Sequence, residues 1–99
     1  MIVEFAAELW LWDARRDDTW VFVSLPEEAS DDIRDVVGAQ SRGFGSVRVQ
    51  VTIGTTSWRT SIFPSADGPY VLPLKKAVRK SEKLDVGDTA AVAIELLDF

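Results

Sequence analysis

The chain has 99 residues, of which 46% are hydrophobic, and its formal net charge at pH 7 is −5. Such a length supports one hydrophobic core and is too short for two ordinary domains, so we expect one domain over residues 1–99. The sequence has neither cysteine nor histidine, which excludes disulfides, thiolate metal sites, cysteine nucleophiles and the most common general base near neutral pH.

The charge is distributed unevenly along the chain. Residues 1–35 carry ten acids and three bases, residues 36–83 two acids and eight bases, and residues 84–99 four acids and no base, which gives −7, +6 and −4. The overall acidity argues against nonspecific nucleic-acid binding, in which phosphate neutralisation is the main contribution. A local basic patch can still bind an anionic partner.

The N-terminus lacks the features of a signal peptide, because it has no basic leader and Glu4 and Glu8 interrupt its apolar run. No stretch of the sequence is long enough and apolar enough to span a bilayer. We therefore expect a cytoplasmic protein with no membrane partner.

Alternating hydrophobicity predicts two strands at the start of the chain. The first spans residues 2–12 and the second residues 19–25, with a polar turn between them. Pro26 ends the second strand, because proline cannot donate to a β-ladder. The residues of the first strand that we expect to face the core are Val3, Phe5, Ala7, Leu9 and Leu11.

A short helix is predicted over residues 30–40. Ser30 is a favourable N-cap residue, and two aspartates follow it in the first turn, where the helix dipole stabilises negative charge. Apolar residues then recur at helical spacing, so one face should pack on the sheet. The residues of that face are Ile33, Val36 and Val37.

The second half of the chain reads as four strands and one helix. Strands 45–53 and 57–63 are predicted to form a hairpin across a Gly-Thr-Thr turn, and we expect a brief strand at 70–72 and a closing strand at 89–97. A helix over residues 74–83 lies between the last two. About six strands and two short helices favour a small closed or partly open β-barrel. The apolar side of the second helix should consist of Leu74, Ala77, Val78 and Leu84.

Three motifs together resemble a known family. They are W-x-F-x-x-L-P at 20–26, F-G-S-V-x-V-x-V-T-I-G at 44–54 and W-R-T-S-I-F-P-x-x-D-G-x-Y-x-L-P-L-K-K-A-V-R-K at 58–80, with G-D-x-x-x-V-x-I at 87–94 beside them. The chain is similar to the small bacterial proteins called domain of unknown function 1905. The resemblance implies a double-split β-barrel, the architecture of some DNA-binding regulators that form swapped dimers, and it implies no catalytic residue.

The helix over 74–83 is the main candidate for a binding surface. Five cations project from it with one acid, Glu82, among them, and such a cluster can bind phosphate, nucleic acid or an acidic partner. A solvated helix face that offsets the acidic remainder of the protein would have the same composition. The candidate anion- or partner-binding residues are Lys75, Lys76, Arg79, Lys80 and Lys83.

Trp10 and Trp12 lie on one face of the first predicted strand. Exposed, they would make an aromatic platform for a ligand ring or a partner side chain; buried, they would be part of the packing. No spacing matches a Ser-Lys nucleophile pair, a carboxylate dyad, a metal site or a phosphate loop, so we expect no catalytic residue, metal or cofactor.

The sequence therefore favours a noncatalytic binding or interaction module, with a protein or a small ligand as its partner. The alternative is a nucleic-acid-associated regulator that uses the basic helix together with Arg48 and Arg59. An enzyme that acts on a small molecule is the least supported of the three. Both a monomer and a homodimer are compatible with the pattern.

Overall fold

The computed structural model describes residues 1–11, 21–38, 45–65 and 68–97. They form seven strands and two helices, and the longest axis of the molecule measures 36 Å. In chain order, the elements are β1 (Ile2–Glu8), β2 (Trp10–Leu11), β3 (Val21–Ser24), α1 (Glu27–Val37), β4 (Val47–Ile53), β5 (Thr56–Pro64), β6 (Tyr70–Pro73), α2 (Lys76–Glu82) and β7 (Thr89–Leu96).

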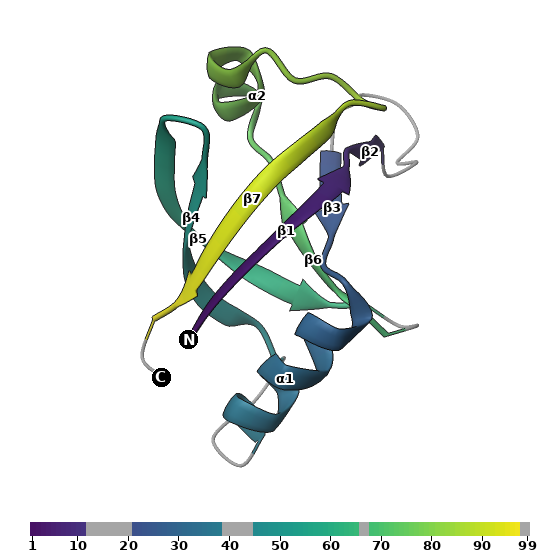
Figure 1. The fold of residues 1–99 in the computed structure, drawn as a ribbon, viewed down its shortest axis with the longest axis vertical. Coiled ribbons are helices and arrows are strands. Elements are labelled where there is room, and N and C mark those ends of the chain that lie inside the picture. The colour runs from purple at the N-terminus through teal and green to yellow at the C-terminus, as the bar shows by residue number, and fades with distance from the viewer. Residues whose placement is uncertain (12–20, 39–44, 66–67, 98–99) are drawn as a thin grey trace.

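The strands are antiparallel and follow the order β1-β7-β4-β5-β6-β3-β2, which wraps into a nearly closed barrel (Figure 1). β1 and β2 are consecutive segments of the first strand, and they stand at opposite ends of this order. β1 pairs with β7, whereas β2 pairs with β3, so this strand is divided between two neighbours. β5 is shared in the same way: it pairs with β4 up to Ile62 and with β6 at Phe63 and Pro64. Two shared strands make this a double-split β-barrel, which confirms the predicted fold class.

The strand count is seven rather than six because the first strand changes partners at Leu9. The Leu9 amide donates to the carbonyl of Asp88 at 2.9 Å, and the Leu9 carbonyl accepts from the amide of Gly87 at 2.9 Å. The Leu9 side chain is buried in the core. The prediction that Leu11 faces the core is wrong, because its side chain is 54% exposed.

The core is built by the inward faces of the strands, as the alternation predicted. In β4 every second residue is buried, and the same holds for β7 and β3. These faces interdigitate in one hydrophobic cluster, with Trp58 and Leu84 packed against it at the end of the barrel near α2. The predicted inward residues that are buried are Val47, Val49, Val51, Ile53, Val92, Ile94 and Leu96.

Helix α1 begins three residues earlier than predicted. Pro26 is its N-cap and makes no side-chain capping hydrogen bond. Ser30, the predicted N-cap, lies inside the helix with 0% exposure, and its Oγ accepts a hydrogen bond from the Tyr70 amide at 2.9 Å. The buried positions are therefore Ser30, Ile33 and Val37, and Val36, which was expected to pack on the sheet, is 40% exposed.

Helix α2 is shorter than the predicted span 74–83. Its N-cap is Lys75, because Leu74 still belongs to the barrel and its amide donates to the Val21 carbonyl at 2.9 Å. The side chains of Leu74 and Val78 are buried, whereas Ala77 is exposed, contrary to expectation. The helix makes about two turns and buries a single residue, Val78.

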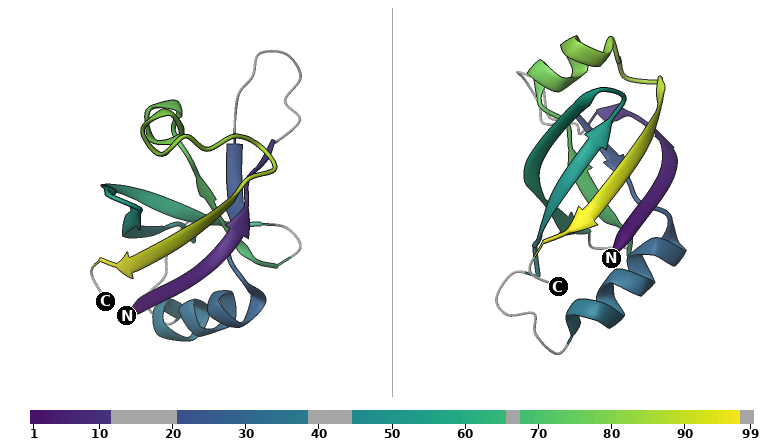
Figure 2. Two further views of the ribbon diagram at one scale, coloured as in Figure 1. Left: turned by 45° about the horizontal axis from the view of Figure 1, so that its top comes forward. Right: turned by 60° about the vertical axis from the view of Figure 1, so that its left-hand side comes forward.

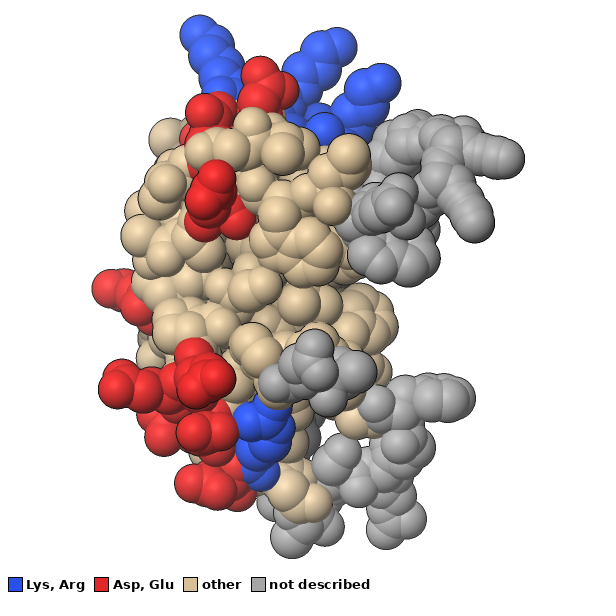
Figure 3. Space-filling view, turned by 90° about the vertical axis from the view of Figure 1, so that its right-hand side faces the viewer, with Lys and Arg blue, Asp and Glu red and all other residues tan. Residues whose placement is uncertain are grey.

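The two helices lie at opposite ends of the barrel (Figures 1 and 2). Basic side chains gather at the end that carries α2, and most acidic side chains in the same view lie toward the end that carries α1 (Figure 3). Neither of these helices, nor any other in the described ranges, is long and apolar enough to cross a membrane. The exposed acids of α1 are Glu27, Glu28, Asp31, Asp32 and Asp35.

Candidate anion-binding site

The basic end of the molecule is formed by α2 and the turn that follows it. Leu74, just before the helix, belongs to the hydrophobic core, and Leu84 packs against that core after the helix has ended. Val78 is the buried residue of the helix itself. The cationic residues consequently point away from the core. Lys75, Lys76, Lys80 and Lys83 are exposed, and Arg79 is half-buried.

A surface pocket of about 370 Å³ lies along this helix. Four of the five predicted cations line it, and Asp85 is the one acid in its lining. Lys75 does not line it, since the N-cap position directs this residue to the start of the helix. The full lining consists of Lys76, Arg79, Lys80, Lys83, Leu84 and Asp85.

Arg79 is the anchored member of the pocket. Its Nε donates to the carbonyl of Leu74 at 3.2 Å, across the first turn of α2. This bond orients the guanidinium group and leaves both terminal nitrogens available to the pocket. Because an arginine fork matches the oxygens of a phosphate or carboxylate, a fixed arginine is well suited to recognise an oxyanion.

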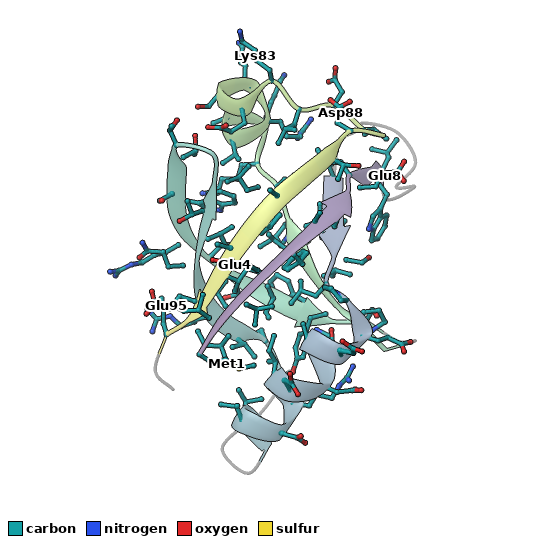
Figure 4. All side chains as sticks on the ribbon, viewed as in Figure 1. Met1, Glu4, Glu8, Lys83, Asp88 and Glu95 are labelled. Carbon is teal, nitrogen blue, oxygen red and sulfur yellow. The ribbon has the colours of Figure 1, made fainter. Side chains whose placement is uncertain are left out.

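Lys83 closes α2 in an unusual conformation. It is the one described residue other than glycine with a positive φ, with φ 56° and ψ 49°. The amide of Leu84 donates to the Arg79 carbonyl at 2.8 Å, as in a Schellman motif. Figure 4 shows Lys83 at the end of the helix, directed away from the barrel, while Glu4 and Glu95 lie farther down its wall.

Glu82 does not oppose the cations of its helix, contrary to the sequence interpretation. Its Oε2 accepts a hydrogen bond from Thr56 Oγ1 at 2.6 Å and a longer one from Thr55 Oγ1 at 3.4 Å. The neighbouring Ser81 also contacts Thr56, with 3.0 Å between the two hydroxyl oxygens. The one acid of α2 is thus held on the tip of the β4–β5 hairpin, and the pocket keeps its cationic character.

Gly54 makes this contact possible. It has a φ of +59°, and a Cβ built on it would overlap the Glu82 carboxylate. We expect Gly54→Ala to lower the free energy of unfolding by about 1–2 kcal/mol, because the left-handed conformation becomes strained and the carboxylate must move. Urea denaturation followed by circular dichroism measures this change.

The matched control is Gly38→Ala at the end of α1. Gly38 has a helical φ of −50°, and a Cβ there would meet no atom within 4 Å. This variant should therefore be unchanged or more stable by about 0.4–1 kcal/mol, since alanine restricts the unfolded chain. Equal losses from both variants would contradict the role given to Gly54.

The other two predicted cations do not join the pocket. Arg48 and Arg59 are exposed on the outer face of the β4–β5 hairpin, with Arg59 Nε donating to Gln50 Oε1 at 3.4 Å. Arg59 is three residues from Thr56 along β5, or about 10 Å at the rise of a strand. The two arginines therefore lie on the side wall of the barrel, while α2 covers its end.

Trp10 is half-buried and has structural partners. Its indole Nε1 donates to Ser24 Oγ at 3.0 Å, and its ring lies 5.2 Å from that of Phe22 between centroids. The strand register places Trp10, Phe22 and Pro73 in one row across β2, β3 and β6, next to the start of α2. Trp12, the other half of the predicted platform, lies outside the described residues.

Sequence reasoning missed the pocket residue Asp85 and the part played by Glu82. Asp85 falls between the predicted helix 74–83 and the predicted strand 89–97, and its amide donates to Asp88 Oδ2 at 2.8 Å. The contact of Glu82 with Thr56 joins residues 26 positions apart, so no local sequence pattern predicts it. Within the described residues there is no group of three His, Cys, Asp or Glu side chains that could hold a metal ion.

A second hollow, of about 430 Å³, lies on the outer face of β1, β7 and β4. It contains one carboxylate and no cation, so it offers nothing to an anion. Its lining consists of Glu4, Phe5, Ala6, Thr52, Gly54, Ala91, Val92 and Ala93.

Comparison with known proteins gives a family and no activity. Residues 5–94 match the model of the family described as Domain of unknown function (DUF1905). No curated protein matches the chain. The family match covers most of the sequence and includes every strand of the barrel except the ends of β1 and β7. This chain therefore belongs to the DUF1905 family.

Proposed function

We propose that this protein is a noncatalytic binding module that takes an anionic partner at the α2 pocket. One observation carries the proposal: four cations line a single pocket, while the acid of the same helix is held on the hairpin by Thr56. Their side chains therefore act together on one ligand. The cytoplasmic location expected from the sequence remains a prediction.

The charge of the whole molecule supports anion binding at the basic end only, rather than over the whole surface. The chain carries −5 overall, so long-range forces repel polyanions and only a partner that fits the basic end gains from the cations. Arg48 and Arg59 lie outside the lining of the α2 pocket, so the pocket by itself does not call for a nucleic acid. A regulator of nucleic acid is therefore the second candidate, and the experiment below separates it from the first.

The proposal predicts where anions bind. In a titration of the ¹⁵N-labelled protein with pyrophosphate or a hexaglutamate peptide at low salt, amide shifts should concentrate on residues 76–85 for at least one of the two. The triple variant Lys76→Gln/Lys80→Gln/Lys83→Gln should bind about tenfold more weakly, because three exposed cations that contribute about 0.5 kcal/mol each amount to about 1.5 kcal/mol.

Lys75→Gln is the matched control, since it removes one charge from the same helix without touching the pocket. Its affinity should stay close to that of the unaltered protein. Absence of shifts with both anions would refute the proposed function. Tight, salt-sensitive binding of a fluorescent DNA duplex that also requires Arg48 and Arg59 would establish the nucleic-acid alternative instead.

A further inference from the structure

The pocket has a composition that a simple anion would not explain. Asp85 lies in its lining among four cations, and its carboxylate repels any purely anionic ligand. Leu84 adds an apolar side chain to the same lining. A carboxylate in a site of this kind contributes to binding only if the ligand also presents hydrogen-bond donors, such as hydroxyl groups.

The size of the pocket favours a small ligand. Its volume of about 370 Å³ is comparable to the lower end of small-molecule sites, which span roughly 300–1,000 Å³. The cations lie within about two turns of helix and the residue after it, so they favour a short group over an extended chain. Arg79, oriented by the carbonyl of Leu74, provides a planar fork for a tetrahedral oxyanion.

Lys83 provides independent support for a ligand at this end of the helix. Glycine is the usual residue where a helix closes in the left-handed conformation, because other residues are strained there. A lysine at this position disfavours the fold locally and places a cation in the pocket lining. Residues held in such conformations are concentrated at functional sites.

From these observations, and resting on the proposed function, we infer that the ligand is a phosphate monoester of a small hydroxylated molecule, such as a sugar phosphate. The phosphate lies against Arg79 and the lysines. The hydroxyl groups donate to the carboxylate of Asp85, and the carbon skeleton contacts Leu84. No bond is formed or broken, since the residues of the pocket supply charge and hydrogen bonds only.

The test uses ribose 5-phosphate as the probe, with free ribose, pyrophosphate and hexaglutamate for comparison. Nuclear magnetic resonance titrations should show ribose 5-phosphate binding at residues 76–85 more tightly than pyrophosphate, and free ribose binding not at all. If hexaglutamate binds there and ribose 5-phosphate does not, the inference is wrong while the proposed function stands. If none of the three anions binds there, both are wrong.

Asp85→Asn separates the two parts of the ligand. It should weaken ribose 5-phosphate, because the stronger acceptor is lost, and strengthen pyrophosphate, because a negative charge is removed. A variant that strengthens both ligands equally would exclude a role of Asp85 in binding hydroxyl groups. Arg79→Lys keeps the charge but loses the fork, and should weaken both phosphates about tenfold.

Lys83→Gly separates binding from stability. It relieves the left-handed strain and should raise the melting temperature, yet weaken ribose 5-phosphate several-fold because a pocket cation is lost. Since this variant is more stable, its weaker binding cannot come from unfolding. Unchanged affinity together with higher stability would overturn the contribution of Lys83 to the site.

Discussion

Leu9→Ala is expected to lower the free energy of unfolding by about 2–5 kcal/mol, the range for truncation of a well-packed leucine. The Leu9 side chain is 1% exposed, and its backbone bonds to Gly87 and Asp88 mark the point where the first strand changes partners. A cavity there weakens the packing where β1, paired with β7, continues into β2, paired with β3. Urea denaturation followed by circular dichroism and tryptophan fluorescence measures the loss.

Leu11→Ala is the matched control, two residues along the same strand. The alternation of the sequence gives both leucines to the core, but Leu11 is 54% exposed. We expect it to cost no more than about 0.5 kcal/mol, as for most surface substitutions. Similar losses from the two variants would mean that the strand continues regularly through Leu9 and that the split is wrong.

Ser30→Asp is expected to destabilise the protein by about 3–5 kcal/mol, the cost of an uncompensated buried charge. Ser30 has no exposed surface, and its hydroxyl accepts the hydrogen bond of the Tyr70 amide at 2.9 Å. Arg34, one turn later, donates to the carbonyl of Gly68 and docks α1 on the same segment. Thermal and urea unfolding of the variant, compared with the unaltered chain, measure the effect.

The same substitution decides where α1 begins. Aspartate is as good an N-cap residue as serine. If Ser30 were the N-cap of α1, Ser30→Asp would therefore not lower the stability. Ser46→Asp, at an exposed position before β4, is the control for the added charge and should change stability by no more than about 0.5 kcal/mol. A neutral Ser30→Asp would show that the helix starts at residue 30 after all.

Patterns in the sequence predict the fold class and most of the core correctly. Period-two alternation identifies the inward faces of β3, β4 and β7, because a half-buried strand must place its apolar residues on one side. The glycine-containing turn predicts the β4–β5 hairpin, and the charge pattern predicts the basic helix. Family-specific motifs gave the double-split architecture. The alternation, the turn and the charge pattern are local signals, because each depends on a few neighbouring residues, whereas the motifs extend over residues 20–94.

The tertiary structure decided what depends on residues that meet only after folding. Leu9 and Leu11 have the same local pattern, and only the change of partner from β7 to β3 separates them. Ser30 looks like an N-cap until the Tyr70 amide, 40 residues away, reaches its hydroxyl. Its position among the cations of α2 makes Glu82 a counter-charge in the sequence, but in the structure its carboxylate accepts a hydrogen bond from Thr56 of the hairpin. That last contact keeps the acid of α2 out of the lining of the pocket, and no sequence periodicity relates its two partners.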